Sequence, residues 1–226
     1  MESFGFKDHT PFKEPLDDSS LEKDGGISTF LEIKSRPNKL IRKVDIHDAV
    51  DSYNFSAFHR GSVSLFEAAR ILVGHIKELN KYGINVPAEF VVGEDQNNKP
   101  ALFMIVDKVI GKNLRELEGS SMTNSLKEEL DNLWTNLIGY LIDKMGEEDG
   151  LIMCDIFRSN QYMYGKIKGS EEEKIYLVDM DPIVSFVDDS MIESIERNIE
   201  DLEMRYNISL TNAKSKLIEI KQASLI

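Results

Sequence analysis

The sequence has few of the features that mark secreted, disulfide-bonded or membrane-spanning chains. Among its 226 residues only Cys154 is a cysteine, so no intrachain disulfide can form and a reducing, cytosolic environment is expected. No apolar run approaches the length that crosses a bilayer, and the first residues lack the basic and then apolar layout of a cleaved signal. We therefore expect neither a disulfide framework nor a membrane anchor.

An excess of positive charge is also missing. The chain has 27 Lys and Arg against 40 Asp and Glu, a net charge of -13. Nucleic-acid backbones and anionic membrane surfaces are bound mainly through Lys and Arg, so we expect neither as a partner. An apolar content of 41% with 30% charged residues is typical of a globular protein, which we expect to be a monomer.

Side chains that can carry chemistry gather around a hairpin predicted between residues 161 and 178. Two short β-type runs there flank a turn rich in Gly and Glu. Asp155 and Asn160 come just before the first run, and Asp179 and Asp181 come just after the second. Carboxylate and carboxamide oxygens at one end of a hairpin suit Mg²⁺, which in turn implies a phosphate-bearing substrate.

The pattern Asp-x-x-x-x-Asn, followed by an Asp beyond a hairpin, resembles the catalytic core of the protein-kinase superfamily. The resemblance implies that Asp155 orients or deprotonates the hydroxyl of the phosphate acceptor. Asn160 and Asp179 would hold the metal, with Asp181 as the competitor of Asp179. Arg158 would stand in for the lysine that relatives carry near the catalytic Asp. ATP and Mg²⁺ are the implied cofactors.

Earlier segments resemble the small lobe of a kinase. Gly25 and Gly26, with Ser28 after them, resemble the loop that covers the phosphates, although the full G-x-G-x-x-G is absent. The next predicted strand runs from residue 39 to 44, after a turn at 35–38. It carries Lys43 where relatives have a phosphate-contacting lysine. Arg42 takes that role if the register slips by one residue.

Apolar residues at helical spacing predict a helix from Ser62 to Lys81, which Gly83 would end. The resemblance implies that a glutamate of this helix pairs with the strand lysine. Glu67 is the first candidate and Glu78 the weaker one. A favourable interaction of Glu67 with the helix dipole is the simpler alternative.

Two further β runs, 88–92 and 101–106, precede a segment that resembles the kinase hinge. There the main chain of Asp107 and Val109 would contact adenine. A long amphipathic helix, 123–145, should then lead to Asp155, and acidic helices should follow the hairpin.

Taken together, the expected fold class is α+β, a bilobal protein-kinase-like fold with a minimal C-terminal lobe. We expect a disordered segment over 1–20 and an N-lobe over 21–108, formed by an antiparallel sheet plus one helix. A reduced helical C-lobe should span 109–226 and carry the catalytic loop and the metal-binding hairpin.

Some residues depart from the superfamily pattern. Met153 replaces a common histidine, Asp179-Met180-Asp181 replaces D-F-G, and no activation segment is recognisable. This economy resembles the small kinase-like effectors of the OspG/NleH type, which Gram-negative bacteria inject into host cells. That resemblance implies a serine/threonine protein kinase, secreted into host cytoplasm, with a host protein as substrate and a host partner as activator. The alternatives are a small-molecule phosphotransferase of the aminoglycoside or choline kinase type, and a pseudokinase that acts as a binding module.

Overall fold

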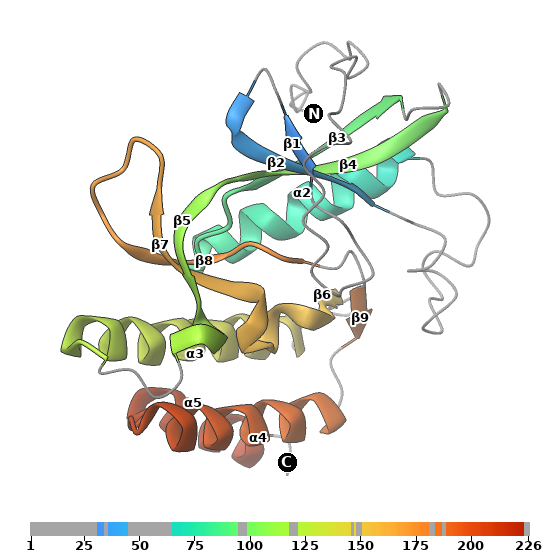
Figure 1. Ribbon diagram of the computed structural model, residues 1–226. Coiled ribbons are helices and arrows are strands. Elements are labelled where there is room, and N and C mark those ends of the chain that lie inside the picture. The colour runs from blue at the N-terminus through green and yellow to red at the C-terminus, as the bar shows by residue number, and fades with distance from the viewer. Residues whose placement is uncertain are drawn as a thin grey trace. The chain divides into compact units, whose positions relative to one another are not determined.

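The computed structural model describes residues 31–33, 36–44, 65–94, 99–117, 122–145, 147, 151–180, 184–186 and 189–223 (Figure 1). The expected tail over 1–20 and the turn with Gly25, Gly26 and Ser28 lie outside this part of the chain. The α+β class predicted from the sequence is confirmed by the strands and helices of the described residues. The chain divides into two compact units, 1–74 with 88–108 and 75–87 with 109–226, which are described in turn.

The first unit contains an antiparallel sheet with the strand order β1-β2-β4-β3. Its strands are β1 (Leu31–Ile33), β2 (Arg36–Val44), β3 (Ala88–Glu94) and β4 (Pro100–Asp107). Six consecutive residues of β4, Ala101 to Val106, are buried, because β4 lies between two strands and is rich in the apolar side chains that pack on a sheet. The turn predicted at 35–38 is wrong, since β2 already begins at Arg36 and pairs there with Ile33.

Helix α2 (Leu65–Lys81) begins in the first unit and ends in the second. Its C-terminus has the Schellman arrangement: the N–H of Ile84 donates to Leu79 O and that of Gly83 to Asn80 O, both at 3.1 Å. Gly83 has φ +75°, a left-handed conformation that favours glycine. Leu79 and Ile84 are fully buried, so this stop also fixes where the chain leaves the helix.

The second unit contains a three-stranded antiparallel sheet with the order β5-β7-β8. Its strands are β5 (Val109–Asn113), β7 (Tyr162–Ile167) and β8 (Lys174–Leu177). The hairpin expected between 161 and 178 is confirmed, and its first strand is longer than predicted. Gly111 faces Gly165 across the β5–β7 pair, and a Cβ on Gly111 would lie 2.0 Å from the Tyr164 carbonyl oxygen. Only glycine fits this close approach of two backbones.

The loop after α2 adds a short parallel bridge to the edge of this sheet, between Asn85 and Tyr176. The carbonyl oxygen of Asn85 accepts the N–H of Leu177 at 2.9 Å, and its side-chain amide donates to Ile175 O at 3.1 Å. Strand β8 is therefore held on one edge by β7 and on the other by a single asparagine.

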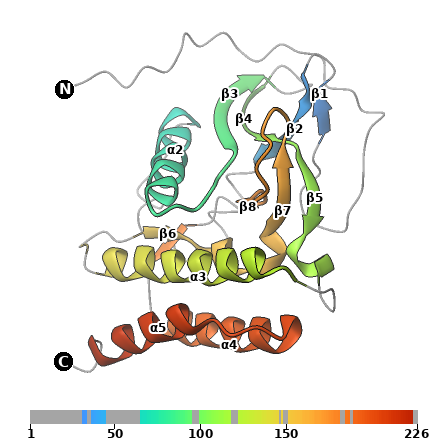
Figure 2. The same ribbon diagram turned by 90° about the vertical axis from the view of Figure 1, so that its left-hand side faces the viewer.

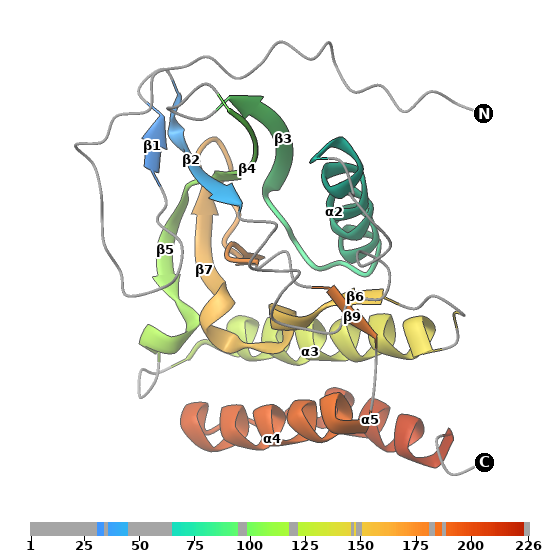
Figure 3. The same ribbon diagram turned by 90° about the vertical axis from the view of Figure 1, so that its right-hand side faces the viewer.

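The remaining elements of the second unit are mostly helical: α3 (Asn124–Met145), α4 (Asp189–Tyr206) and α5 (Thr211–Ala223). Figures 2 and 3 show α3 lying between the β5-β7-β8 sheet on one side and α4 with α5 on the other. Asp131 of α3 accepts the N–H groups of Asn212 and Ala213, and so caps the first turn of α5. Two short strands, β6 (Leu151–Met153) and β9 (Val184–Phe186), pair beside α3.

In the part of the chain that the structure describes, every helix is too short or too polar to cross a membrane.

Candidate functional site

The site loop, residues 154–161, connects β6 to β7. It consists of two 3₁₀ turns, Cys154–Phe157 and Ser159–Gln161, and buries Ile156 and Phe157 beneath it. Arg158 and Asn160 are exposed. The backbone of Asp155 belongs to the first turn, whereas its side chain lies outside the described part of the chain. The buried Ile156 and Phe157 thus anchor the loop to the core, while the polar Arg158 and Asn160 stay exposed to solvent.

Two side chains hold carbonyl groups of the site loop. The hydroxyl of the fully buried Tyr162 donates to Ile156 O, and burial raises the pKa of that hydroxyl, which keeps it a donor. The amide of Asn113, at the end of β5, donates to Asn160 O at 2.8 Å. Both hydrogen bonds are accepted by main-chain carbonyl groups, so neither involves the side-chain amide of Asn160.

Gln161 joins the site loop to Asp179. Its carbonyl oxygen accepts the N–H of Val178 at 3.0 Å and that of Asp179 at 3.3 Å. With its amide nitrogen turned toward Asp179, the Gln161 side chain donates to Asp179 Oδ2 at 3.2 Å and to Asp179 O at 2.7 Å. Gln161, the residue after Asn160, is therefore in direct contact with Asp179, which lies beyond the hairpin.

The two candidates for the phosphate-contacting cation, Lys43 and Arg42, are neighbours on β2 and lie on opposite faces of the first sheet. Lys43 is exposed and lies across β4 from Phe103. Arg42 is only 2% exposed and lies across from Met104, which also faces Phe90 of β3. A buried guanidinium is stable only where partners satisfy it, so Arg42 has a structural cost that Lys43 does not have.

The residues expected at the hinge lie in strands. Asp107 ends β4, where its carboxylate forms a 2.9 Å ion pair with Lys39 of β2, and the next N–H, of Lys108, donates to Asn38 O at 2.8 Å. Val109 is buried and begins β5 across from Ile167 of β7. The stretch 109–113, within the segment that resembles the hinge, is therefore a paired strand, which the sequence did not predict.

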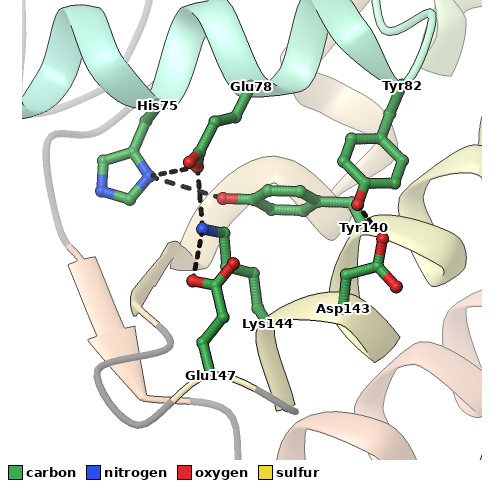
Figure 4. A network of polar contacts seen from close by, with 7 residues as sticks. All are labelled: His75, Glu78, Tyr82, Tyr140, Asp143, Lys144 and Glu147. Carbon is green, nitrogen blue, oxygen red and sulfur yellow. Dashed lines mark hydrogen bonds and ion pairs between the residues drawn. The ribbon is translucent and has the colours of Figure 1, made fainter.

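Glu67 lies in α2, but its side chain is outside the described part of the chain, as is Asp181. Glu78, the weaker candidate for the lysine partner, lies in the second unit and is paired there. It accepts from Lys144 of α3 at 3.0 Å, and Glu147 accepts from the same ammonium at 2.8 Å (Figure 4). Glu78 thus has a structural partner that the sequence did not reveal.

Two residues next to this ion pair, His75 and Tyr140, are also buried. The Tyr140 hydroxyl lies 3.4 Å from His75 Nδ1, and the Glu78 carboxylate lies 3.9 Å from the same nitrogen (Figure 4). Burial lowers the pKa of His75 more than Glu78 raises it, and burial raises the pKa of Tyr140. Burial would lower the pKa of Lys144, but the hydrogen bonds to Glu147 and Glu78 outweigh it and the pKa is raised.

Sequence reasoning missed Gln161, Asn113, Asn85 and Lys144. Three are amides whose bonds go to backbone atoms or to one carboxylate, and a lone Asn or Gln carries no periodic signal in a sequence. Lys144 lies near the end of an amphipathic helix, where a lysine usually meets solvent and the last carbonyls. Gln161 alone was detectable, because it is polar at a position where the predicted β run should begin to be buried.

The residues around Asp179 fit a magnesium ion. In the described residues no group of three or more His, Cys, Asp or Glu side chains gathers, and the side chains of Asp155 and Asp181 lie outside those residues. Mg²⁺ prefers a different arrangement, with one or two carboxylates plus waters and substrate phosphates. Asn160 is exposed, and the next residue, Gln161, bonds through its neutral amide to the half-buried Asp179, so the site loop and the end of the hairpin offer oxygen donors of that kind.

Apart from strand β5, which the sequence did not predict, the described elements follow the order that the resemblance to the protein-kinase superfamily predicts: a sheet with one helix, a long helix, a loop and a hairpin. No protein-family model matches the sequence, and no curated protein matches it. One similar solved structure is WaaP in complex with acyl carrier protein, at 12% identity and a TM-score of 0.41, covering 90% of this chain and 77% of that one.

A second similar structure is the Rio2 kinase complex with ADP, Mg²⁺ and phosphoaspartate from Chaetomium thermophilum. It has 15% identity and a TM-score of 0.44, and the match covers 84% of this chain and 57% of that one. Residues cannot be matched one by one at such identities, so the function below is inferred from the contacts of this chain.

Proposed function

We propose that this chain is a phosphotransferase of kinase fold, dependent on ATP and Mg²⁺, that transfers a phosphoryl group to a protein hydroxyl. The observation that carries the proposal is the direct bonding of Gln161 to Asp179, which brings the end of the Asp-x-x-x-x-Asn loop to the residue beyond the hairpin. Two oxygen ligands are then presented by two rigid elements, which is what a metal-assisted transfer needs.

Each candidate residue has a role in this proposal. Asn160 and Asp179 hold the metal, with Asp181 as the alternative to Asp179, and Asp155 orients the acceptor hydroxyl. The bound Mg²⁺ supplies charge neutralisation around the transferred group. Arg158, exposed in the site loop, is a second cation that neutralises charge on the transferred group.

On the nucleotide side, Lys43 contacts phosphate, with Arg42 as its alternative and Glu67 as its partner. Gly25, Gly26 and Ser28 cover the phosphates, and the main chain of Asp107 and Val109 meets adenine. These assignments are supported by position along the chain, and by the accessibility of Lys43 for a soluble ligand.

Thermal unfolding with nucleotide and metal tests the proposal. A ligand that binds only the native state stabilises it by about 2.7 kcal/mol at 100 times its Kd. We expect millimolar ATP with Mg²⁺ to raise Tm, ATP with EDTA to raise it little, and Mg²⁺ alone to leave it unchanged. A Tm that does not respond to ATP and Mg²⁺ together would contradict the phosphotransferase function while leaving the fold intact.

A transfer assay then separates the acceptor classes. Radiolabelled ATP is offered with a casein-like protein in one arm and with a panel of aminoglycosides and choline in the other. We expect label on the protein. Label on a small alcohol alone would make the chain a small-molecule phosphotransferase, and nucleotide binding without transfer to either would make it a binding module.

A role as an injected effector is a further part of the proposal, supported by the resemblance to small effector kinases. It predicts that transfer to protein increases when lysate of a eukaryotic host is added, because a host partner would activate the enzyme. Equal transfer with heat-treated and native lysate would exclude a folded host activator.

A further inference from the structure

The carboxamide of Gln161 is buried, with the residue only 5% exposed, at the junction of the site loop and β7. A polar group removed from water needs hydrogen-bond partners. The two atoms that face it, Asp179 Oδ2 and Asp179 O, are both acceptors, so only the amide nitrogen can satisfy them. One amide therefore holds both the carboxylate and the main chain of the same aspartate.

The chemistry of this donor differs from that of a charged one. A neutral N–H₂ on Oδ2 restricts rotation of the carboxylate and does not itself neutralise the carboxylate's charge. A lysine or arginine in that place would neutralise the charge and compete with any other cation. Partners of this kind, which bond to a ligand rather than to the metal, orient the ligand and tune the metal's affinity.

We propose that Gln161 is the positioning residue of Asp179: it fixes the carboxylate in the orientation that receives a divalent cation. The inference rests on the phosphotransferase function proposed above and adds to it a residue that the Asp-x-x-x-x-Asn pattern does not contain. Gln161 acts through Asp179 and does not itself touch nucleotide or acceptor.

The backbone of Gln161 allows its side chain to be tested separately. Its carbonyl oxygen accepts from Val178 N and Asp179 N, and these bonds remain whatever the side chain is. Gln161→Met keeps an unbranched side chain of similar length and removes only the amide. A change in metal affinity in that variant is then a property of the carboxamide.

Asn85 provides the matched control. It is also an amide that bonds to the hairpin strand β8, through Ile175 O at 3.1 Å, but it bonds at the opposite edge and has no bond to Asp179. Asn85→Ala therefore weakens the support of β8 without changing the carboxylate. Any effect shared by Asn85→Ala and Gln161→Met is a general loosening of the strand.

The experiment measures the affinity of each variant for ADP across a series of Mg²⁺ concentrations, together with the Tm of the ligand-free protein. We expect Gln161→Met to need about 10- to 100-fold more Mg²⁺ for half-maximal tightening of ADP binding. Asn85→Ala should lower Tm and leave the Mg²⁺ dependence as in the wild type.

Gln161→Lys tests the same idea in the opposite way. Its ammonium can pair with the Asp179 carboxylate and act as an internal cation. We expect this variant to keep the Tm of the ligand-free wild type and to lose the Mg²⁺ dependence of ADP binding, so it remains informative if Gln161→Met does not fold.

The possible failures can be told apart. Wild-type protein with no Mg²⁺-dependent ADP binding would refute both the proposed function and this inference. A normal wild type with an unchanged Mg²⁺ requirement in Gln161→Met or Gln161→Lys would refute the inference alone. Equal weakening in Asn85→Ala and Gln161→Met would also refute it, because both would then act only by loosening β8.

Discussion

Two polar clusters of the second unit hold their carboxylates in opposite ways. At the end of the hairpin, Asp179 is bonded by the neutral amide of Gln161. Between α2 and α3, Glu78 and Glu147 share the ammonium of Lys144, at 3.0 and 2.8 Å (Figure 4). The amide orients the first carboxylate without adding a charge, whereas the second pair has its charge compensated by Lys144.

This difference separates a site from a structural contact. A neutral donor favours the binding of an external cation to a carboxylate, because a cation of the protein at that place would have to be displaced first. At a structural contact a permanent cation stabilises the two carboxylates by compensating their charge. Lys144 is such a cation, and it is buried. In the second unit the carboxylate at the expected ligand site is therefore bonded by an amide, and the two carboxylates at the structural contact are bonded by a lysine.

The largest effect should come from removing the carboxylate that carries the first cluster. Asp179→Ala should abolish both phosphoryl transfer and Mg²⁺-dependent nucleotide binding, because it removes a direct ligand. Asp155→Ala should lower the rate of phosphoryl transfer by several orders of magnitude while keeping the affinity for ATP with Mg²⁺. Nucleotide titration and single-turnover assays distinguish the two. Retention of metal-dependent binding in Asp179→Ala, together with its loss in Asp181→Ala, would reverse the assignment of the metal ligand.

A second large difference is expected between substitutions of Lys43 and Arg42, the neighbouring cations of β2. Lys43→Met should lower phosphoryl transfer by more than tenfold and change the free energy of unfolding by less than about 0.5 kcal/mol, as an exposed substitution does. Arg42→Met should destabilise the protein by about 1 to 3 kcal/mol, because it replaces a side chain that is only 2% exposed and packed within the sheet. Urea unfolding and transfer assays on both variants provide the measurement. If Lys43→Met is fully active, and Arg42→Lys is active where Arg42→Met is not, the phosphate contact belongs to position 42.

Much of the fold could be predicted from periodic signals in the sequence. The helix that ends at Lys81 and the helix that ends at Met145 were expected with these ends, because apolar residues recur at helical spacing and Gly83 follows the first. The hairpin was expected because two apolar runs flank a turn. What failed was local: β5 was missed, because its five residues include a glycine, a lysine and an asparagine, and only pairing with β7 makes them a strand.

The candidate site was predictable in its acidic residues and not in its supporting ones. Asp155, Asn160 and Asp179 stand at recognisable spacings, whereas the side-chain amides of Gln161, Asn85 and Asn113 bond to partners that are distant in sequence. The face of β2 that carries the buried cation was not predictable either. Lys43 and Arg42 are adjacent, so the choice depended on a register that only the pairing with β4 defines.

A medium effect is expected from the cation of the second cluster. Lys144→Met should lower the free energy of unfolding by about 1 to 2 kcal/mol, less than for a fully buried pair, because water can still reach the two glutamates. Lys216→Met is the matched control: Lys216 and Glu219 form the same i,i+3 pair at 2.8 Å on the exposed side of α5. That variant should change stability by less than about 0.5 kcal/mol. Equal effects in urea unfolding would contradict a special role for burial.

The smallest effect concerns the pH dependence of the same cluster. Because burial lowers the pKa of His75 in the folded state, protonation is easier in the unfolded chain, and the unfolded state binds more protons below the ordinary value of 6.5. The contribution of His75 to stability should therefore fall as pH decreases from about 7 through 6.5. Glu78 and Lys144 also face the ring. The pKa of Lys144 and that of Tyr140 are raised, so both groups stay protonated in that range. In His75→Gln the drop in unfolding free energy between pH 7.5 and 5.5 should be smaller than in the wild type. Identical pH profiles for the two proteins would mean that His75 does not titrate as a buried neutral ring.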